Sequence, residues 1–168
     1  MSPEITASEV MQTDVRSVSS KMAVVDLEDL LLRLGIGGAP VVDDGKLVGV
    51  VSRSDIVRHL AGDFAAESID TEYYWDMGGP TSPRDRGRSA PADGGAVESA
   101  LVDLHVADLM IEDIISVAPE SPVSLVAGLM VRRHIHRVLV VDGDELKGVL
   151  TTMDLTRLFV DGRAVAQS

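Results

Sequence analysis

The sequence predicts an α/β protein made of two copies of one β-α-β-β-α unit. Three observations support this. Residues 10–60 align with residues 109–159 without a gap, and 16 of the 51 pairs are identical. Each copy shows the same order of apolar runs and turn residues. The 168 residues are 45% hydrophobic but only 3% aromatic, which indicates an aliphatic core. Because duplication fixes architecture, we expect two subdomains related by a pseudo-twofold axis, with their sheets packed face to face.

The first copy begins with a short β-like stretch at residues 15–18. A helix follows, and Gly35 ends it. Residues 40–42 and 47–51 form two strands, since an Asp-Gly turn between apolar runs is typical of a hairpin. A second helix begins near Ser52. The first helix is indicated by apolar residues at spacings of three and four, namely Val24, Leu27, Leu30, Leu31 and Leu34.

The second copy repeats this order. Its first strand is predicted at residues 114–117, and Ser121 followed by Pro122 predicts a helix N-cap and first helical position. Strands at 138–141 and 146–150 flank a turn. The predicted organisation is therefore repeat one over residues 1–60 and repeat two over residues 105–168.

The inter-repeat segment, residues 61–104, has a different composition. It begins with a helical stretch that carries the single Trp and both Tyr residues. Residues 78–95 are then rich in Gly, Pro, Ser and charge, without apolar periodicity. We expect a flexible tether there, and the role of the whole segment stays open.

Composition argues against several function classes. The formal charge of −12 and the pI of about 4.6 oppose nucleic-acid binding, which needs a basic face. No apolar run approaches the ~20 residues that span a bilayer. The acidic, polar N-terminus is unlike a signal peptide, and cysteine is absent, so we expect a cytoplasmic protein. The sequence shows no nucleophile–base pair, metal-ligand cluster or glycine-rich phosphate loop, so we expect neither an enzyme nor a metal site.

One short motif occurs at the start of the last helix in each copy. It reads G-h-h-[ST]-x-x-D, where h is apolar. Its hydroxyl and its acid are Ser52 and Asp55 in the first copy, and Thr151 and Asp154 in the second. A capping box explains the pair, because the hydroxyl and the acid both serve the helix start. A nucleotide site explains it too. A helix N-terminus attracts phosphate, and a carboxylate one turn later can accept hydrogen bonds from a ribose diol.

A basic cluster precedes the hairpin of the second copy. Arg132 and Arg133 fit the C-terminus of the preceding helix. His136 and Arg137 lie beyond that helix, just before a strand, and the first copy has glycines at the matching positions. These two residues are our candidates for a cation that faces phosphate.

Both copies resemble the CBS (cystathionine-β-synthase) domain, and the tandem resembles the arrangement called a Bateman module. The resemblance is carried by Glu9-Val10-Met11 and Asp108-Leu109-Met110, followed by IGGAPVVDDGKLVGVVSRSD and IHRVLVVDGDELKGVLTTMD. It implies a regulatory, non-catalytic module. It also implies an adenosine-containing ligand in clefts between the repeats: AMP, ADP or ATP, or alternatively S-adenosylmethionine or NAD. Similar modules commonly form homodimers.

The resemblance also implies roles for individual residues. The hydroxyl and acid pairs, Ser52 with Asp55 and Thr151 with Asp154, would meet phosphate and ribose, and His136 with Arg137 would face phosphate. The adenine would lie against the partner copy. The residues implied are Val15, Arg16, Ile36 and Gly37 for the Asp154 cleft, and Ile114, Ile115, Ile135 and His136 for the Asp55 cleft.

Some features depart from the family pattern. Residues 20–23 lack the usual proline at a helix start, and Leu139 stands where the first copy has Pro40. None of these changes removes a ligand group. A ligand-free structural or dimerisation module stays as the alternative. No effector domain is recognisable in this sequence, so we expect that a signal passes to another, unknown protein or that the sequence is part of a larger one.

Overall fold

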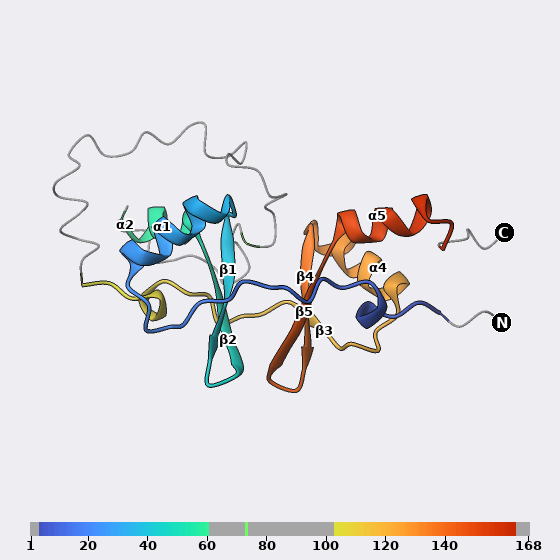
Figure 1. The fold of residues 1–168 in the computed structure, drawn as a ribbon, viewed down its shortest axis with the longest axis horizontal. Coiled ribbons are helices and arrows are strands. Elements are labelled where there is room, and N and C mark those ends of the chain that lie inside the picture. Colours follow the sequence, from blue (N-terminus) through green and yellow to red (C-terminus); the bar gives the residue numbers. More distant parts are fainter. Residues whose placement is uncertain (1–3, 61–72, 74–102, 164–168) are drawn as a thin grey trace. The chain divides into compact units, whose positions relative to one another are not determined.

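The computed structural model describes residues 4–60, 73 and 103–163, which divide into two compact units (Figure 1). The repeat-one unit spans Arg16–Ile114, and the repeat-two unit combines Met1–Val15 with Ile115–Ser168. Each unit therefore contains most of one repeat together with the first residues of the other repeat. Of the predicted inter-repeat segment, residues 61–72 and 74–102 lie outside the described residues.

The repeat-one unit contains α1 (Val24–Leu34), β1 (Gly38–Asp43), β2 (Lys46–Ser52), α2 (Arg53–Leu60) and the 3-10 turn η4 (Val106–Asp108). Strands β1 and β2 pair antiparallel. The stretch predicted as a strand at residues 15–18 makes a single parallel bridge, from Val18 to Val41. On the other edge, Val50 bridges Ile111.

The repeat-two unit contains η1 (Ala7–Glu9), β3 (Ser116–Val117), α4 (Val123–Arg133), β4 (Arg137–Asp142), β5 (Glu145–Thr151) and α5 (Thr152–Val160). The sheet order is β3-β4-β5, with β3 parallel and β5 antiparallel to β4. Gln12 bridges Val149 on the free edge of β5. The two units thus share one plan, and the predicted α/β class is confirmed.

The core of each unit is aliphatic, as composition predicts. Leu27, Leu31 and Val41 are completely buried in the repeat-one unit, as are Val126 and Leu139 in the repeat-two unit. Burial of such side chains from both helices and strands is the main stabilising contribution to a small unit. Within the described part of the chain, no helix is long and apolar enough to cross a membrane.

In each unit, the first helix is capped at its N-terminus by a segment from outside its own repeat. We call residues 4–15 and 103–114 the exchanged segments. The carbonyl of Leu104 accepts a hydrogen bond from the Val24 amide at 2.9 Å, and the carbonyl of Ile5 accepts one from the Val123 amide at 2.9 Å. Neither N-cap residue, Ala23 or Pro122, supplies a side-chain cap. The predicted N-cap at Ser121 is therefore wrong by one residue, because backbone from a distant segment satisfies the first helical amide.

Two glycines of the repeated motif permit the exchanged segments to approach. A side chain at Gly49 would place its Cβ 2.9 Å from the Ile111 carbonyl oxygen, and one at Gly148 would place it 2.7 Å from the Gln12 carbonyl oxygen. Real Cβ contacts almost never fall below 3.0 Å. The glycine is thus required by packing of the segment against the strand.

Candidate ligand site at the two helix starts

In the repeat-one unit the hydroxyl–acid pair lies where β2 passes into α2. Ser52 is the last residue of β2, and Asp55 lies in the first turn of α2. The Ser52 amide and hydroxyl both donate to Oδ2 of Asp55, each at 2.7 Å. The exposed fractions are 0% for Ser52 and 5% for Asp55. A buried carboxylate with these donors is well stabilised at a helix N-terminus.

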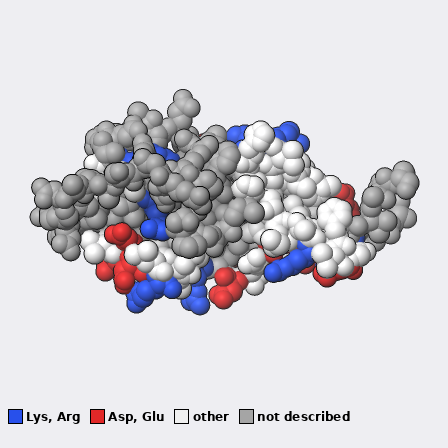
Figure 2. All heavy atoms as spheres, turned by 90° about the horizontal axis from the view of Figure 1, so that it is seen from above, with Lys and Arg blue, Asp and Glu red and all other residues white. Residues whose placement is uncertain are grey.

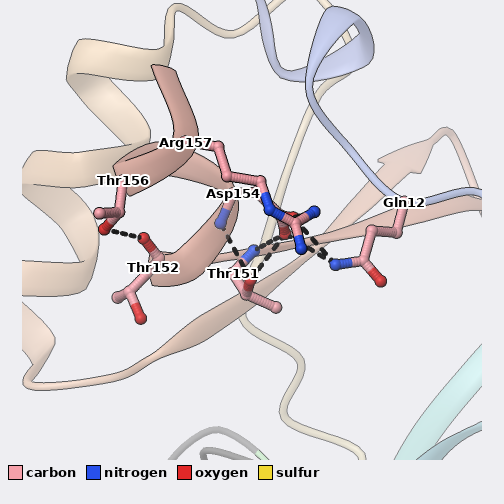
Figure 3. Close-up of polar contacts among 6 residues, drawn as sticks. All are labelled: Gln12, Thr151, Thr152, Asp154, Thr156 and Arg157. Carbon is pink, nitrogen blue, oxygen red and sulfur yellow. Dashed lines mark hydrogen bonds and ion pairs between the residues drawn. The ribbon is translucent and has the colours of Figure 1, made fainter. Parts of the chain in front are cut away.

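The repeat-two unit has the same arrangement between β5 and α5 (Figure 3). The Thr151 amide and hydroxyl donate to Oδ2 of Asp154 at 2.9 Å and 2.6 Å, and the Thr151 hydroxyl accepts from the Asp154 amide at 3.3 Å. Asp154 is only 3% exposed. The capping-box interpretation of the motif therefore describes this structure. The same groups remain chemically suited to phosphate and ribose.

An arginine one turn after each acid faces it. Arg58 Nη1 lies 3.4 Å from Oδ1 of Asp55, and Arg157 Nη1 lies 3.7 Å from Oδ1 of Asp154. The Arg58 side chain is 16% exposed and the Arg157 side chain 67% exposed, so water screens the second pair far more. We did not predict these arginines as site residues, although they are an identical pair at helical spacing from each acid.

The residues before each hairpin lie beside the helix start of their own unit. The carbonyl of Gly37 accepts from the Arg53 amide at 2.9 Å, and the carbonyl of His136 accepts from the Thr152 amide at 2.9 Å. Arg137 pairs with Thr151 across the ladder of β4 and β5. Structure therefore brings Gly37 to the Asp55 helix, and His136 and Arg137 to the Asp154 helix.

The other predicted residues are distributed around these positions. Ile36 is half-buried and Ile135 is buried, each just after a helix end. Ile115 accepts a backbone hydrogen bond from Leu139 at 3.3 Å, next to β4. Contact of an adenine with the partner copy involves residues of different units and stays a prediction. The remaining predicted residues lie in the connecting stretches between the units' elements: Val15 and Ile114, both half-buried, and Arg16, which is exposed.

Gln12 was missed by sequence reasoning. Its Nε2 donates to both carboxylate oxygens of Asp154, at 2.9 Å to Oδ1 and 3.1 Å to Oδ2 (Figure 3). In the repeat alignment the matching residue is Ile111, which has no polar side-chain atom. Gln12 is therefore a partner of Asp154 for which the aligned position of the first repeat offers no equivalent. Among the described residues, no group of three or more His, Asp or Glu side chains could hold a metal ion.

Comparison with known proteins identifies the fold. The model of the CBS domain matches residues 7–62 and 106–161. Protein MJ1426 of Methanocaldococcus jannaschii is 30% identical over 145 residues, which cover 82% of this chain and 81% of that protein.

Two solved structures similar to this chain contain adenosine compounds. CBSX2, a CBS-pair protein of Arabidopsis thaliana, was solved in complex with AMP; it has a TM-score of 0.64 and 22% identity, and covers 95% of this chain and 98% of that one. The CBS domain pair of protein MJ0100 was solved with 5'-methylthioadenosine and S-adenosyl-L-methionine. It has a TM-score of 0.60 and 21% identity, and covers 95% of this chain and 99% of that one.

Proposed function

We propose that this chain, which belongs to the CBS domain family, is a regulatory, non-catalytic module that binds an adenine nucleotide, AMP, ADP or ATP. One observation carries the proposal. A buried carboxylate beside a hydroxyl occurs at the start of a helix in both units, at Ser52 with Asp55 and at Thr151 with Asp154. Both acids are buried with their hydrogen bonds satisfied within the chain, and a nucleotide's phosphate and ribose could take over the same hydroxyl and carboxylate.

The chemistry of these groups suits a nucleotide. The positive end of a helix dipole favours phosphate, and Ser52 or Thr151 can turn its hydroxyl toward a phosphate oxygen. Asp55 or Asp154 can then accept hydrogen bonds from the ribose 2'- and 3'-hydroxyls. The adenine would lie against the residues that the family resemblance implies.

The complexes of similar proteins support an adenosine ligand without choosing among nucleotides. AMP and S-adenosyl-L-methionine share the adenosine moiety. S-adenosylmethionine and NAD are therefore the alternative ligands. A ligand-free structural or dimerisation module is the alternative function.

Isothermal titration calorimetry of the full chain with AMP, ADP, ATP, S-adenosylmethionine and NAD tests the proposal. Asp55→Asn and Asp154→Asn keep the side-chain shape but remove one acceptor oxygen. Each should weaken the nucleotide at its own unit roughly ten- to a hundredfold, because a hydrogen bond to a charged group is lost. Asp26→Asn, in the first turn of α1 and exposed, is the matched control. No binding of any of the five compounds favours the ligand-free module, whereas unchanged affinity in both site variants contradicts the assignment of the ligand to these two acids.

Arg137 and His136 are our proposed phosphate contacts. The family resemblance assigns the pair to the Asp55 cleft first, and Arg137 is long enough to reach phosphates in either cleft. The ladder pairing of Arg137 with Thr151 supports its reach to the α5 helix start. Arg137→Ala should weaken ATP more than adenosine, and it should reduce the salt dependence of ATP binding, since one screened charge contact is removed. Equal losses for ATP and adenosine would assign Arg137 a structural role instead.

We also propose that the protein works in the cytoplasm as a homodimer that signals to an effector protein. Large apolar side chains are exposed on the helices of the repeat-two unit, where the described surface is mostly uncharged (Figure 2). Such patches mark interaction surfaces, and a twofold dimer is the commonest assembly. Sedimentation velocity should show a dimer at tens of micromolar, and a charge at Phe159 should shift it to monomer. The exposed residues are Leu125, Val131, Met153, Phe159 and Val160.

A further inference from the structure

Gln12 holds the carboxylate of Asp154 from outside the repeat that contains it. Its backbone is fixed to β5 by two hydrogen bonds, with the Gln12 amide donating to Val149 at 2.8 Å and the Val149 amide donating back at 2.9 Å. Val149 lies two residues before Thr151, so the Gln12 side chain reaches the helix start (Figure 3). The amide nitrogen of Gln12, and not its amide oxygen, faces Asp154, because carboxylate oxygens accept hydrogen bonds and donate none.

The oxygens of Asp154 are already well supplied with donors. Oδ2 accepts from the Thr151 amide, from the Thr151 hydroxyl and from Gln12, while Oδ1 accepts from Gln12 and faces Arg157. An ionised carboxylate offers about four lone-pair positions. A ribose diol brings two further donors, so it needs the positions that the Gln12 amide occupies.

The repeat-one unit has the same scaffold without this amide. Ile111 is bound to Val50 by the equivalent two backbone hydrogen bonds, at 2.8 Å and 2.9 Å. An isoleucine side chain donates nothing, so no donor from this position competes for Asp55. The difference between the units at this point is thus a single side chain on an otherwise repeated bridge.

We propose that Gln12 is a specificity-determining residue that competes with ribose for Asp154. It keeps the Thr151–Asp154 helix start closed to a nucleoside diol until the amide swings away. Gln12 is exposed to solvent, which gives the displaced amide water as a new partner. This inference rests on the proposed function, because it concerns how the same site takes its nucleotide.

The test uses calorimetry with AMP on the full-length chain in an Asp55→Asn background, where binding reports the Asp154 site. Gln12→Ile, which copies the residue of repeat one, should bind AMP about tenfold more tightly than the background. Gln12→Ala serves as a second variant if isoleucine disturbs the bridge. With 2',3'-dideoxy-AMP the gain should disappear, because that ligand has no diol to compete with the amide.

The reciprocal variant tests the other unit. In an Asp154→Asn background, Ile111→Gln should weaken AMP binding at the Asp55 site several-fold. Unchanged or weaker AMP binding in both Gln12 variants overturns the inference while leaving the proposed function in place, and so does an equal gain for AMP and the dideoxy ligand. Absence of AMP binding in every variant overturns both the proposed function and the inference.

Discussion

The helix starts at Asp55 and Asp154 have the same local geometry but different surroundings. In both, the preceding hydroxyl and amide donate to Oδ2 of the acid. Around Asp55 the hydroxyl is fully buried and the facing arginine is mostly buried, whereas Asp154 has a half-buried threonine, an exposed arginine and the amide of Gln12. A duplicated scaffold therefore kept its local capping contacts while the partners that arrive from distant segments diverged.

The largest expected effect comes from the glycine under each exchanged segment. Gly148→Ala should lower the free energy of unfolding by about 3 kcal/mol and Gly49→Ala by about 2 kcal/mol, since overpacking against fixed backbone relaxes poorly. Gly148 is the tighter position, because a Cβ there would lie 2.7 Å from both the Gln12 carbonyl oxygen and the Met11 sulfur. Urea unfolding measures the difference between the variants.

Gly128→Ala is the matched control for these changes. Its Cβ would meet only the flexible end of Arg132, at 3.0 Å, and alanine favours the interior of α4. The control should therefore stabilise the protein by roughly 0.5–1 kcal/mol. Equal and small effects at Gly148 and Gly49 would show that the exchanged segments do not pack as tightly as the structure indicates.

Replacing the buried acid should lower the free energy of unfolding more at Asp55 than at Asp154. Asp55→Ala removes the acceptor of the fully buried Ser52 amide and the carboxylate that faces the mostly buried Arg58, which costs about 3 kcal/mol. Asp154→Ala leaves donors that lie nearer to water, on Thr151 and Gln12, so the expected cost is about 1–2 kcal/mol. Chemical denaturation without nucleotide measures both values, and a larger cost at Asp154 would contradict the comparison.

The smallest expected effect concerns the residue that ends the first helix of each repeat. Gly35 and His134 both adopt the left-handed conformation, with φ of 63° and 54°. Gly35→Ala should cost about 1 kcal/mol, because a Cβ is strained there even though no atom lies within 4 Å. His134→Gly should stabilise by about 0.5 kcal/mol, since the strain relieved exceeds the added entropy of the unfolded chain. Thermal melting of the pair measures this, and a stabilising Gly35→Ala would contradict it.

Several features of the molecule could be predicted from local sequence. Apolar spacing between Val24 and Leu34 indicated the helix α1, which ends before Gly35, and the Asp-Gly turns located both hairpins. The hydroxyl and acid three residues apart indicated the polar pair at both helix starts, and the pair at Thr151 and Asp154 forms a complete capping box. These features depend on contacts within a few residues, and such contacts leave a periodic or fixed-spacing signal in the chain.

Sequence by itself thus determined the duplication, the order of elements and the two polar helix starts. Tertiary structure alone decided that the first residues of each repeat join the other repeat's unit and that the carbonyls of Ile5 and Leu104 accept from the first amides of distant helices. It also decided that Gln12 holds Asp154 across 142 residues. Such contacts follow no period, because chain folding brings together positions whose separation along the sequence is unconstrained. Glycine at 49 and 148 was visible as a repeat, but only packing against the exchanged segments explains why no other residue fits there.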